Sequence, residues 1–400
     1  MSIRSHFWRA VKTACLAAVL AVAVPAAAAP FTPQRDDQVL ERLPERAADP
    51  QARRQAALRQ QLRQRPQDAA VAAELVRGYL QAVAAEGDPR LIGYAQAALA
   101  PWWSQPAPPA ELRVLRARLL QFNHQFAPAV ADLQAVVAAD PAQGEAWSWL
   151  TAIAMVQARY ADARAGCARL APLAEPLIGV ACQAAVDGLT GQADAAAQAL
   201  DAAMRREAST TSAPARLWAA TRLAELQERR GQAAAAEAAF KTALAADPVD
   251  GYALAAYADF LLDQRRPAEV LTLLRGKERA DLLLLRLAVA AQAVRAPEAA
   301  RWADELGARF DAARQRGDLV HQKEEARYRL ALRGDGAGAL PLAQANYAVQ
   351  REPADARILL EAALAARQPA AAEPALRWLA EHRVQSTVLQ ALAAQLKGLK

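Results

Sequence analysis

The chain has 400 residues, of which 54% are hydrophobic and 22% are charged, and it carries 48 basic against 42 acidic side chains. A chain of this length is too long for one ordinary hydrophobic core, so several domains or a repeat array are expected. No dense run of Lys and Arg with interleaved aromatic residues is present, which argues against nucleic acid as a partner.

The first 28 residues have the pattern of a secretory signal peptide. Three cations precede an uncharged apolar run, TACLAAVLAVAV, which spans Thr13 to Val24 and ends at Pro25. This run is shorter than the roughly 20 residues that span a bilayer. We therefore expect cleavage after Ala28 and an exported protein, located in the periplasm or secreted. Removing three cations leaves 45 basic and 42 acidic side chains, a net charge of about +3.

The rest of the chain divides by composition and by the phase of its apolar residues. Helical signals cover most of it, and the interruptions are rich in proline, glycine, serine or threonine. The predicted segments are a disordered or loosely attached stretch at 29–50, a helical array at 51–206, a polar linker at 207–216, a second array at 217–385 and a capping helix at 386–400. GDGAGA, at 334–339, is expected to form a flexible turn inside a helix pair.

One spacing recurs along both arrays. In GQAAAAEAAFKTALAADP, which begins at Gly231, a small residue, Ala236, is followed by bulky Phe240 and a terminal Asp-Pro. Ala129 and Ala163 hold the same place in earlier units, and the period is about 34 residues. Apolar residues three and four apart share one helical face, and proline cannot continue a helix. Each unit is therefore predicted to be a helix–turn–helix.

In these residues the chain resembles the tetratricopeptide repeat family. The resemblance is strongest over residues 110–175 and 217–250, and weaker units cover 69–99 and 281–317. It implies an all-α solenoid of nine to ten helix pairs, wound as a right-handed superhelix, whose first helices line a concave surface.

The resemblance also implies that the concave surface binds an extended peptide or a helix of a partner protein. Aromatic and acidic residues at its groove-facing positions suit a partner with apolar and basic side chains. Packing against an adjacent turn is an equally good account of Trp218 and Tyr252. The expected groove residues are Glu111, Arg118, Phe122, Glu145, Met155, Trp218, Glu225, Glu228, Tyr252, Asp259 and Asp263.

Two cysteines remain after the predicted cleavage, Cys167 and Cys182. They lie on the second helix of one unit and the first helix of the next, two helices that must pack together in a stacked array. In an oxidising compartment a disulfide between them is feasible. Two small buried thiols remain the alternative, because free cysteine packs well in a core.

No other motif indicates chemistry. His124, His321 and His382 form no cluster with the spacing of metal ligands, so no metal or other cofactor is expected. The carboxylates alternate with arginine as on a solvated helix face, and no catalytic residue stands out.

We therefore expect a non-catalytic scaffold that binds a protein or peptide, serving in envelope assembly or secretion. The alternative is a helical-repeat enzyme or carrier acting on a cell-wall or small-molecule ligand. Its catalytic carboxylate would lie between Ala69 and Trp103, where the repeat is weakest.

Overall fold

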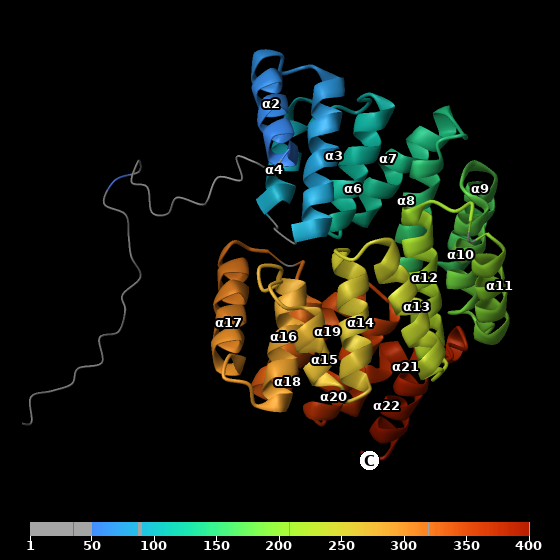
Figure 1. The fold of residues 1–400 in the computed structure, drawn as a ribbon, viewed down its shortest axis with the longest axis vertical. Coiled ribbons are helices and arrows are strands. Elements are labelled where there is room, and N and C mark those ends of the chain that lie inside the picture. The colour runs from blue at the N-terminus through green and yellow to red at the C-terminus, as the bar shows by residue number, and fades with distance from the viewer. Residues whose placement is uncertain (1–34, 36–49, 87–89, 208, 319, 400) are drawn as a thin grey trace, which may run out of the picture. The chain divides into compact units, whose positions relative to one another are not determined.

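The structure is a computed structural model that describes residues 35, 50–86, 90–207, 209–318 and 320–399 (Figure 1). It divides into residues 1–49 and a compact unit, Pro50–Lys400, and everything below concerns the second of these. The predicted signal peptide, residues 1–28, lies outside the described residues, and so does nearly all of 29–50. No helix of the described part is both long and apolar enough to cross a membrane.

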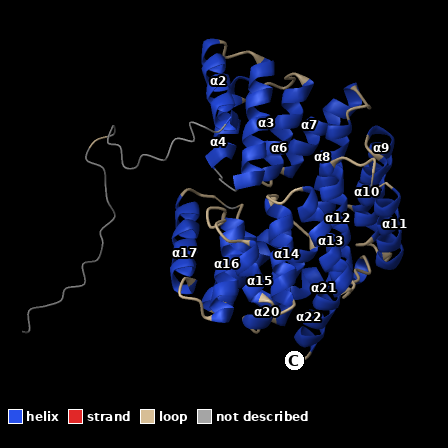
Figure 2. Ribbon diagram, in the orientation of Figure 1, coloured by secondary structure: helices blue, strands red, loops and turns tan. Residues whose placement is uncertain are grey.

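The described residues form helices and no strand (Figure 2). Nine helix pairs follow one another in this part of the chain, with α2 (Pro50–Gln64) before them and α22 (Thr387–Lys397) after them. The predicted all-α solenoid of tetratricopeptide-like pairs is confirmed. The first helices are α3 (Ala69–Glu86), α6 (Ala110–Phe122), α8 (Gly144–Val156), α10 (Pro176–Asp187), α12 (Ala213–Arg229), α14 (Gly251–Asp263), α16 (Asp281–Val294), α18 (Gln322–Arg333) and α20 (Pro353–Ala365).

The second helix of each pair packs antiparallel to the first. These helices are α4 (Arg90–Ala98), α7 (Phe126–Ala139), α9 (Tyr160–Leu170), α11 (Ala193–Arg206), α13 (Ala233–Ala246), α15 (Pro267–Leu273), α17 (Ala299–Gln315), α19 (Gly336–Val349) and α21 (Glu373–Glu381). Three short elements lie between them: α5 (Ala100–Trp103), η1 (Ala171–Leu173) and η2 (Pro369–Ala372).

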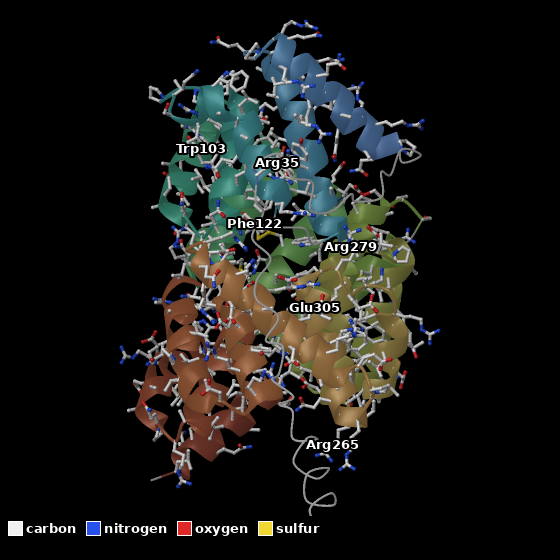
Figure 3. All side chains as sticks on the ribbon, turned by 90° about the vertical axis from the view of Figure 1, so that its left-hand side faces the viewer. Arg35, Trp103, Phe122, Arg265, Arg279 and Glu305 are labelled. Atoms are coloured by element: carbon white, nitrogen blue, oxygen red, sulfur yellow. A yellow bond between two sulfur atoms is a disulfide. The ribbon has the colours of Figure 1, made fainter. Side chains whose placement is uncertain are left out.

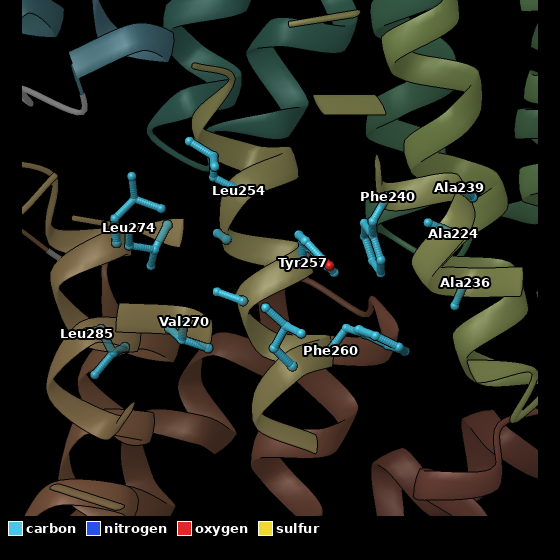
Figure 4. Close-up of a cluster of buried hydrophobic side chains, with 14 of the residues drawn as sticks. Ala224, Ala236, Ala239, Phe240, Leu254, Tyr257, Phe260, Val270, Leu274 and Leu285 are labelled. Atoms are coloured by element: carbon cyan, nitrogen blue, oxygen red, sulfur yellow. The ribbon is translucent and has the colours of Figure 1, made fainter. Parts of the chain in front are cut away.

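The small residues of the repeat lie between packed helices. Ala129, Ala163 and Ala236 are all completely buried. Phe240 stacks on Tyr257 of the next pair with ring centroids 5.4 Å apart, and Figure 4 shows it in that cluster. Alanine thus lets the backbones approach, and the aromatic ring fills the space between successive pairs.

The turn is described in the eight pairs from α6–α7 to α20–α21, and there it repeats as regularly as the helices. In the turn between α8 and α9, Arg159 N–H donates to the Ala154 carbonyl, which is the six-to-one bond of a Schellman motif. The residue before the donor has a positive φ, which is 56° at Ala158. Equivalent positive-φ positions in the other pairs are His124, Gly191, Gly231, Arg265, Arg295, Gly334 and Arg367.

The prediction of a flexible turn at 334–339 is wrong for residues 336–339, which are helical. The turn consists of Gly334 and Asp335, and α19 begins at Gly336. Asp335 caps this helix, because its Oδ1 accepts from the N–H of Gly338 at 2.8 Å. A Cβ at Gly336 would lie only 2.7 Å from that of Ala365, so this glycine permits a close helix contact rather than flexibility.

A capped helix begins within the predicted linker, and another begins at the start of the predicted cap. Helix α12 begins at Ala213, inside the predicted linker 207–216, and Ser212 caps it. Ser386 likewise caps α22, with its Oγ accepting from the N–H of Leu389 at 3.3 Å. Leu389 and Leu396 are buried in the cluster that also contains α20 residues, so α22 covers the last pairs.

The array does not contact only its nearest neighbours. One hydrophobic cluster joins residues of α8–α10, such as Tyr160, to residues of α19–α22, such as Trp378. Trp378 Nε1 donates to Tyr160 Oη at 3.0 Å, and Arg351 N–H donates to the Val156 carbonyl at 2.7 Å. The C-terminal pairs therefore close back onto pairs about 200 residues earlier in the chain (Figure 1).

A buried ion pair holds the proline-rich connection before α6. Arg116 donates to both oxygens of Asp132, at 2.7 and 2.6 Å, and this pair joins α6 to α7. Its Nη1 also donates to the carbonyls of Trp102, Trp103 and Gln105, at 2.9, 2.7 and 2.9 Å. One guanidinium thus provides hydrogen bonds for three backbone carbonyls of the proline-rich connection. The repeat spacing gave no structure for this connection.

We predict that Arg116→Ala lowers the free energy of unfolding by about 3–5 kcal/mol, because buried Asp132 loses both short hydrogen bonds and keeps only the longer contact with Arg113, at 3.9 Å. Urea denaturation followed by circular dichroism measures the change. The double variant Arg116→Met with Asp132→Leu is the control and should recover most of the loss. Wild-type stability in Arg116→Ala would contradict this account.

A second prediction concerns Arg265, an exposed residue at a positive φ of 58° (Figure 3). A side chain in this conformation costs roughly 1–2 kcal/mol, and glycine avoids that cost. We expect Arg265→Gly to be more stable than Arg265→Ala by about 1 kcal/mol in thermal or urea unfolding. Equal stability of the two variants would show that the turn is not strained.

Candidate functional site

The first helices place their polar side chains on a shared inner wall. In its N-terminal part, Arg77 of α3 donates to Glu111 of α6 at 3.3 Å and to Glu145 of α8 at 3.3 Å. Arg118 Nη1 donates to Glu145 at 3.2 Å, and its guanidinium lies 5.2 Å from the ring centroid of Trp149. Arg77, Glu111, Arg118, Glu145 and Trp149 are named the N-terminal strip here.

The strip remains open to solvent. The side chains of Glu111, Arg77 and Glu145 are 52%, 38% and 38% exposed. Burial lowers the pKa of the Arg118 guanidinium, although the carboxylate of Glu145 acts against that effect. An exposed strip of paired charges beside a tryptophan can recognise a partner that offers both charged and apolar groups.

Sequence reasoning found Glu111, Arg118 and Glu145 of this strip and missed Arg77 and Trp149. The signal for Arg77 was present, because Arg77, Glu111 and Glu145 follow one another at intervals of 34 residues. Arg77 was overlooked because its own unit is a weak match to the repeat.

Three of the expected groove residues contribute to hydrophobic packing. Phe122 packs against the cluster of α3 and α4 residues, and Met155 packs against the cluster that includes α19–α22. Trp218 is partly buried between two clusters. These contacts fit the alternative in which Trp218 packs against its neighbours.

In the C-terminal part of the wall, the expected acidic residues hold arginines of this same chain. Asp259 pairs with Arg286 at 2.6 Å and with Arg327 at 2.7 Å. Burial alone would raise the pKa of Asp259, but the two guanidinium groups hold it well below its usual range. Asp263 makes a two-pronged pair with Arg357 of α20, at 2.6 and 2.7 Å, across 94 residues of sequence. The C-terminal pairs thus occupy this part of the wall.

Between these two parts lies a half-exposed tyrosine. Tyr252 is 51% exposed, and its hydroxyl donates to Glu225 at 2.5 Å. Arg222 lies over its ring at 5.0 Å and pairs with Glu225 at 3.1 Å. Although the residue is half-exposed, desolvation of its hydroxyl is the main cause that raises the pKa of that group, so the hydroxyl stays protonated and acts as a donor.

Glu228 differs from the other acidic residues of the wall, because it makes no hydrogen bond or ion pair with the described residues. Burial, followed by the negative charges of Asp263, Glu225 and Asp259, raises its pKa to about 8. At neutral pH this carboxyl is therefore mostly protonated.

The structure joins Cys167 of α9 and Cys182 of α10 in a disulfide. Both residues are buried, with 2% and 4% exposure, in the cluster that receives the C-terminal helices. The bond closes a loop of 15 residues, for which chain entropy predicts a stabilisation of about 3 kcal/mol. It joins α9 and α10, the two helices against which the C-terminal pairs pack.

Three features of the described residues bear on a small-molecule site. These residues contain no group of three His, Cys, Asp or Glu side chains that could hold a metal ion. In the segment 69–103, the described carboxylate Glu74 pairs with Arg54 at 2.6 Å and is half-exposed. A cavity of about 540 Å³ beside α10 and α11 is lined largely by alanine and glycine, and its Asp187 already accepts from Gln183 and Arg164.

No protein-family model matches the chain, and no curated protein matches it. Solved structures that it resembles include the Cut9–Hcn1 hetero-tetramer of APC/C (14% identity, 82% of this chain, 67% of that chain, TM-score 0.46) and yeast Tom70 (8%, 86%, 84%, 0.41). The TPR domain of P58(IPK) is a further one, at 13% identity, 81% and 98% coverage and a TM-score of 0.23. The fold assignment rests on the helix pairs described above.

The pKa of Glu228 generates a prediction for stability against pH. A carboxyl with a folded-state pKa near 8 and an ordinary value of 4.5 binds its proton more tightly in the folded state. Its stabilising contribution is full below pH 4.5 and is lost as the pH rises through 8. Glu228→Gln should therefore match the wild type at pH 4.5 and exceed it at pH 9 by on the order of a few kcal/mol.

Urea denaturation of both proteins at pH 4.5, 7 and 9 measures this difference. Glu74→Gln, which changes an exposed carboxylate, is the control and should show no growing advantage with pH. A constant difference between Glu228→Gln and the wild type would mean that Glu228 titrates normally.

Proposed function

We propose that this protein is an exported, non-catalytic scaffold that binds a protein or peptide partner along the N-terminal strip. The observation that carries the proposal is the contrast along the inner wall. Arginines of the chain pair with all four carboxylates, but the side chains of Glu111 and Glu145 are 52% and 38% exposed, against 24% and 22% for Asp259 and Asp263. The exposed half is the part of the wall that a second molecule can reach.

The chemistry of the strip suggests what the partner carries. Its charges alternate in sign, and Trp149 offers an aromatic surface beside Arg118. Tyr252 extends the half-exposed aromatic surface along the wall. A segment with basic and apolar side chains would pair with Glu111 and Glu145 and cover the aromatic rings. Export and a role in envelope assembly or secretion rest on the N-terminal sequence pattern.

Photo-crosslinking in intact producing cells tests this proposal. A photoreactive amino acid at Glu111 should give one defined adduct, and the same group at Gln134, an exposed residue of α7, should not. Glu145→Lys should reduce the Glu111 adduct at least about tenfold, because it reverses the charge that both arginines contact.

Glu373→Lys is the matched control, since it also breaks an exposed Arg–Glu pair but lies on α21, which carries no residue of the strip. It should leave the adduct unchanged, and both variants should melt close to the wild type. An adduct that survives Glu145→Lys would exclude the strip as the binding surface. Turnover of peptidoglycan or another envelope substrate by the purified protein would instead favour the enzyme alternative.

A further inference from the structure

Arg229, near the end of α12, is an exception among the arginines of the inner wall. Its side chain makes no ion pair with the described residues, and its Nε atom is buried without a hydrogen-bond partner, as are those of Arg118 and Arg222. By contrast, the other arginines of the wall each pair with a carboxylate, namely Arg77, Arg118, Arg222, Arg286, Arg327 and Arg357. An unpaired cation that is partly removed from water is costly to fold, so its presence needs a reason.

The surrounding structure leaves room for this guanidinium. A Cβ at Gly188, the residue that ends α10, would lie 3.2 Å from Arg229 Nη2 and 2.8 Å from Leu226 Cδ1. Glycine at this place thus accommodates Arg229 where α10 meets α12. Burial lowers the pKa of Arg229, and the charges of Glu225 and Glu228 act against that effect without reversing it.

The neighbouring carboxylates do not neutralise Arg229. Glu225 is engaged by Arg222 and by the hydroxyl of Tyr252. Glu228 is mostly protonated at neutral pH, because its pKa is raised to about 8. One positive charge therefore remains uncompensated at this point of the wall.

We propose that Arg229 is the anchor of an oxyanion-binding site, which takes a carboxylate or phosphate group of a ligand. The planar fork of a guanidinium matches two oxygens of either group. The charge balance around Arg229 favours an anion while Glu228 is protonated and weakens that preference once Glu228 ionises. The site stands independently of the N-terminal strip, which lies on other helices.

The test uses the full-length protein with ¹⁵N-labelled arginine and follows the Nε–Hε resonance of Arg229 by NMR. Sodium acetate and inorganic phosphate are titrated separately, and sodium chloride keeps the ionic strength constant. We expect a saturable shift with at least one of the two anions and none with chloride alone. A response to acetate only, or to phosphate only, identifies which oxyanion the site takes.

Variants identify the residue responsible. Arg229→Gln should weaken the affinity for the anion, measured from anion-dependent thermal stabilisation, at least about tenfold. A tenfold change in Kd corresponds to ~1.4 kcal/mol. Arg275→Gln removes an exposed arginine outside the wall and should bind like the wild type. If Arg229→Gln does not fold, the titration of the wild-type resonance still decides the question.

A pH arm tests the part assigned to Glu228. Acetate should bind more weakly at pH 9 than at pH 7, and Glu228→Gln should remove this difference. The charged and titratable groups that act on Glu228 or Arg229 are Arg222, Glu225, Tyr252, Asp259, Asp263, Arg357 and Tyr160. Absence of any saturable shift, or unchanged binding in Arg229→Gln, would overturn the proposal.

Discussion

Close contact between helices at small residues is the constraint on which the rest of this structure depends. Ala129, Ala163 and Ala236 are completely buried at equivalent places in their pairs, and a larger side chain there would force the helices apart. Because the helices approach closely, the bulky residues beyond them reach the next pair, as Phe240 does. Stacking pair on pair then aligns the first helices, and this alignment produces the inner wall with its polar side chains.

The inner wall serves two purposes in one chain. Its C-terminal part closes the molecule, because Asp259 and Asp263 hold arginines from α16, α18 and α20. Its N-terminal part pairs charges among α3, α6 and α8 and keeps Arg77, Glu111 and Glu145 exposed. Closure also depends on apolar packing around Tyr160 and Trp378, next to the disulfide of α9 and α10. Stability and recognition are therefore assigned to different stretches of the same surface.

The sequence could predict whatever repeats and could not predict what joins distant repeats. A common pattern recurs every 34 residues or so: apolar residues in helical phase, small alanines and a terminal Asp-Pro. This pattern predicted the helix pairs and placed Glu111 and Glu145 in the groove. The pairing of Asp263 with Arg357 depends on how far the array curves over 94 residues, and periodicity carries no measure of curvature. The turns show a second limit. Glycine indicates a positive φ at Gly231, whereas the residue type gives no such signal at Arg265, which has a positive φ at the equivalent place.

The closure of the C-terminal pairs onto Tyr160 and Val156 also bears on how such a chain can change in length. An open array can gain or lose a unit at little cost, because each unit touches only its neighbours. Here one inserted unit between α10 and α20 would rotate every later helix, and Trp378 would no longer meet Tyr160. The contacts between α8–α10 and α19–α22 therefore fix the number of units between these helices. A unit can be duplicated or deleted without breaking these contacts only outside that part of the chain.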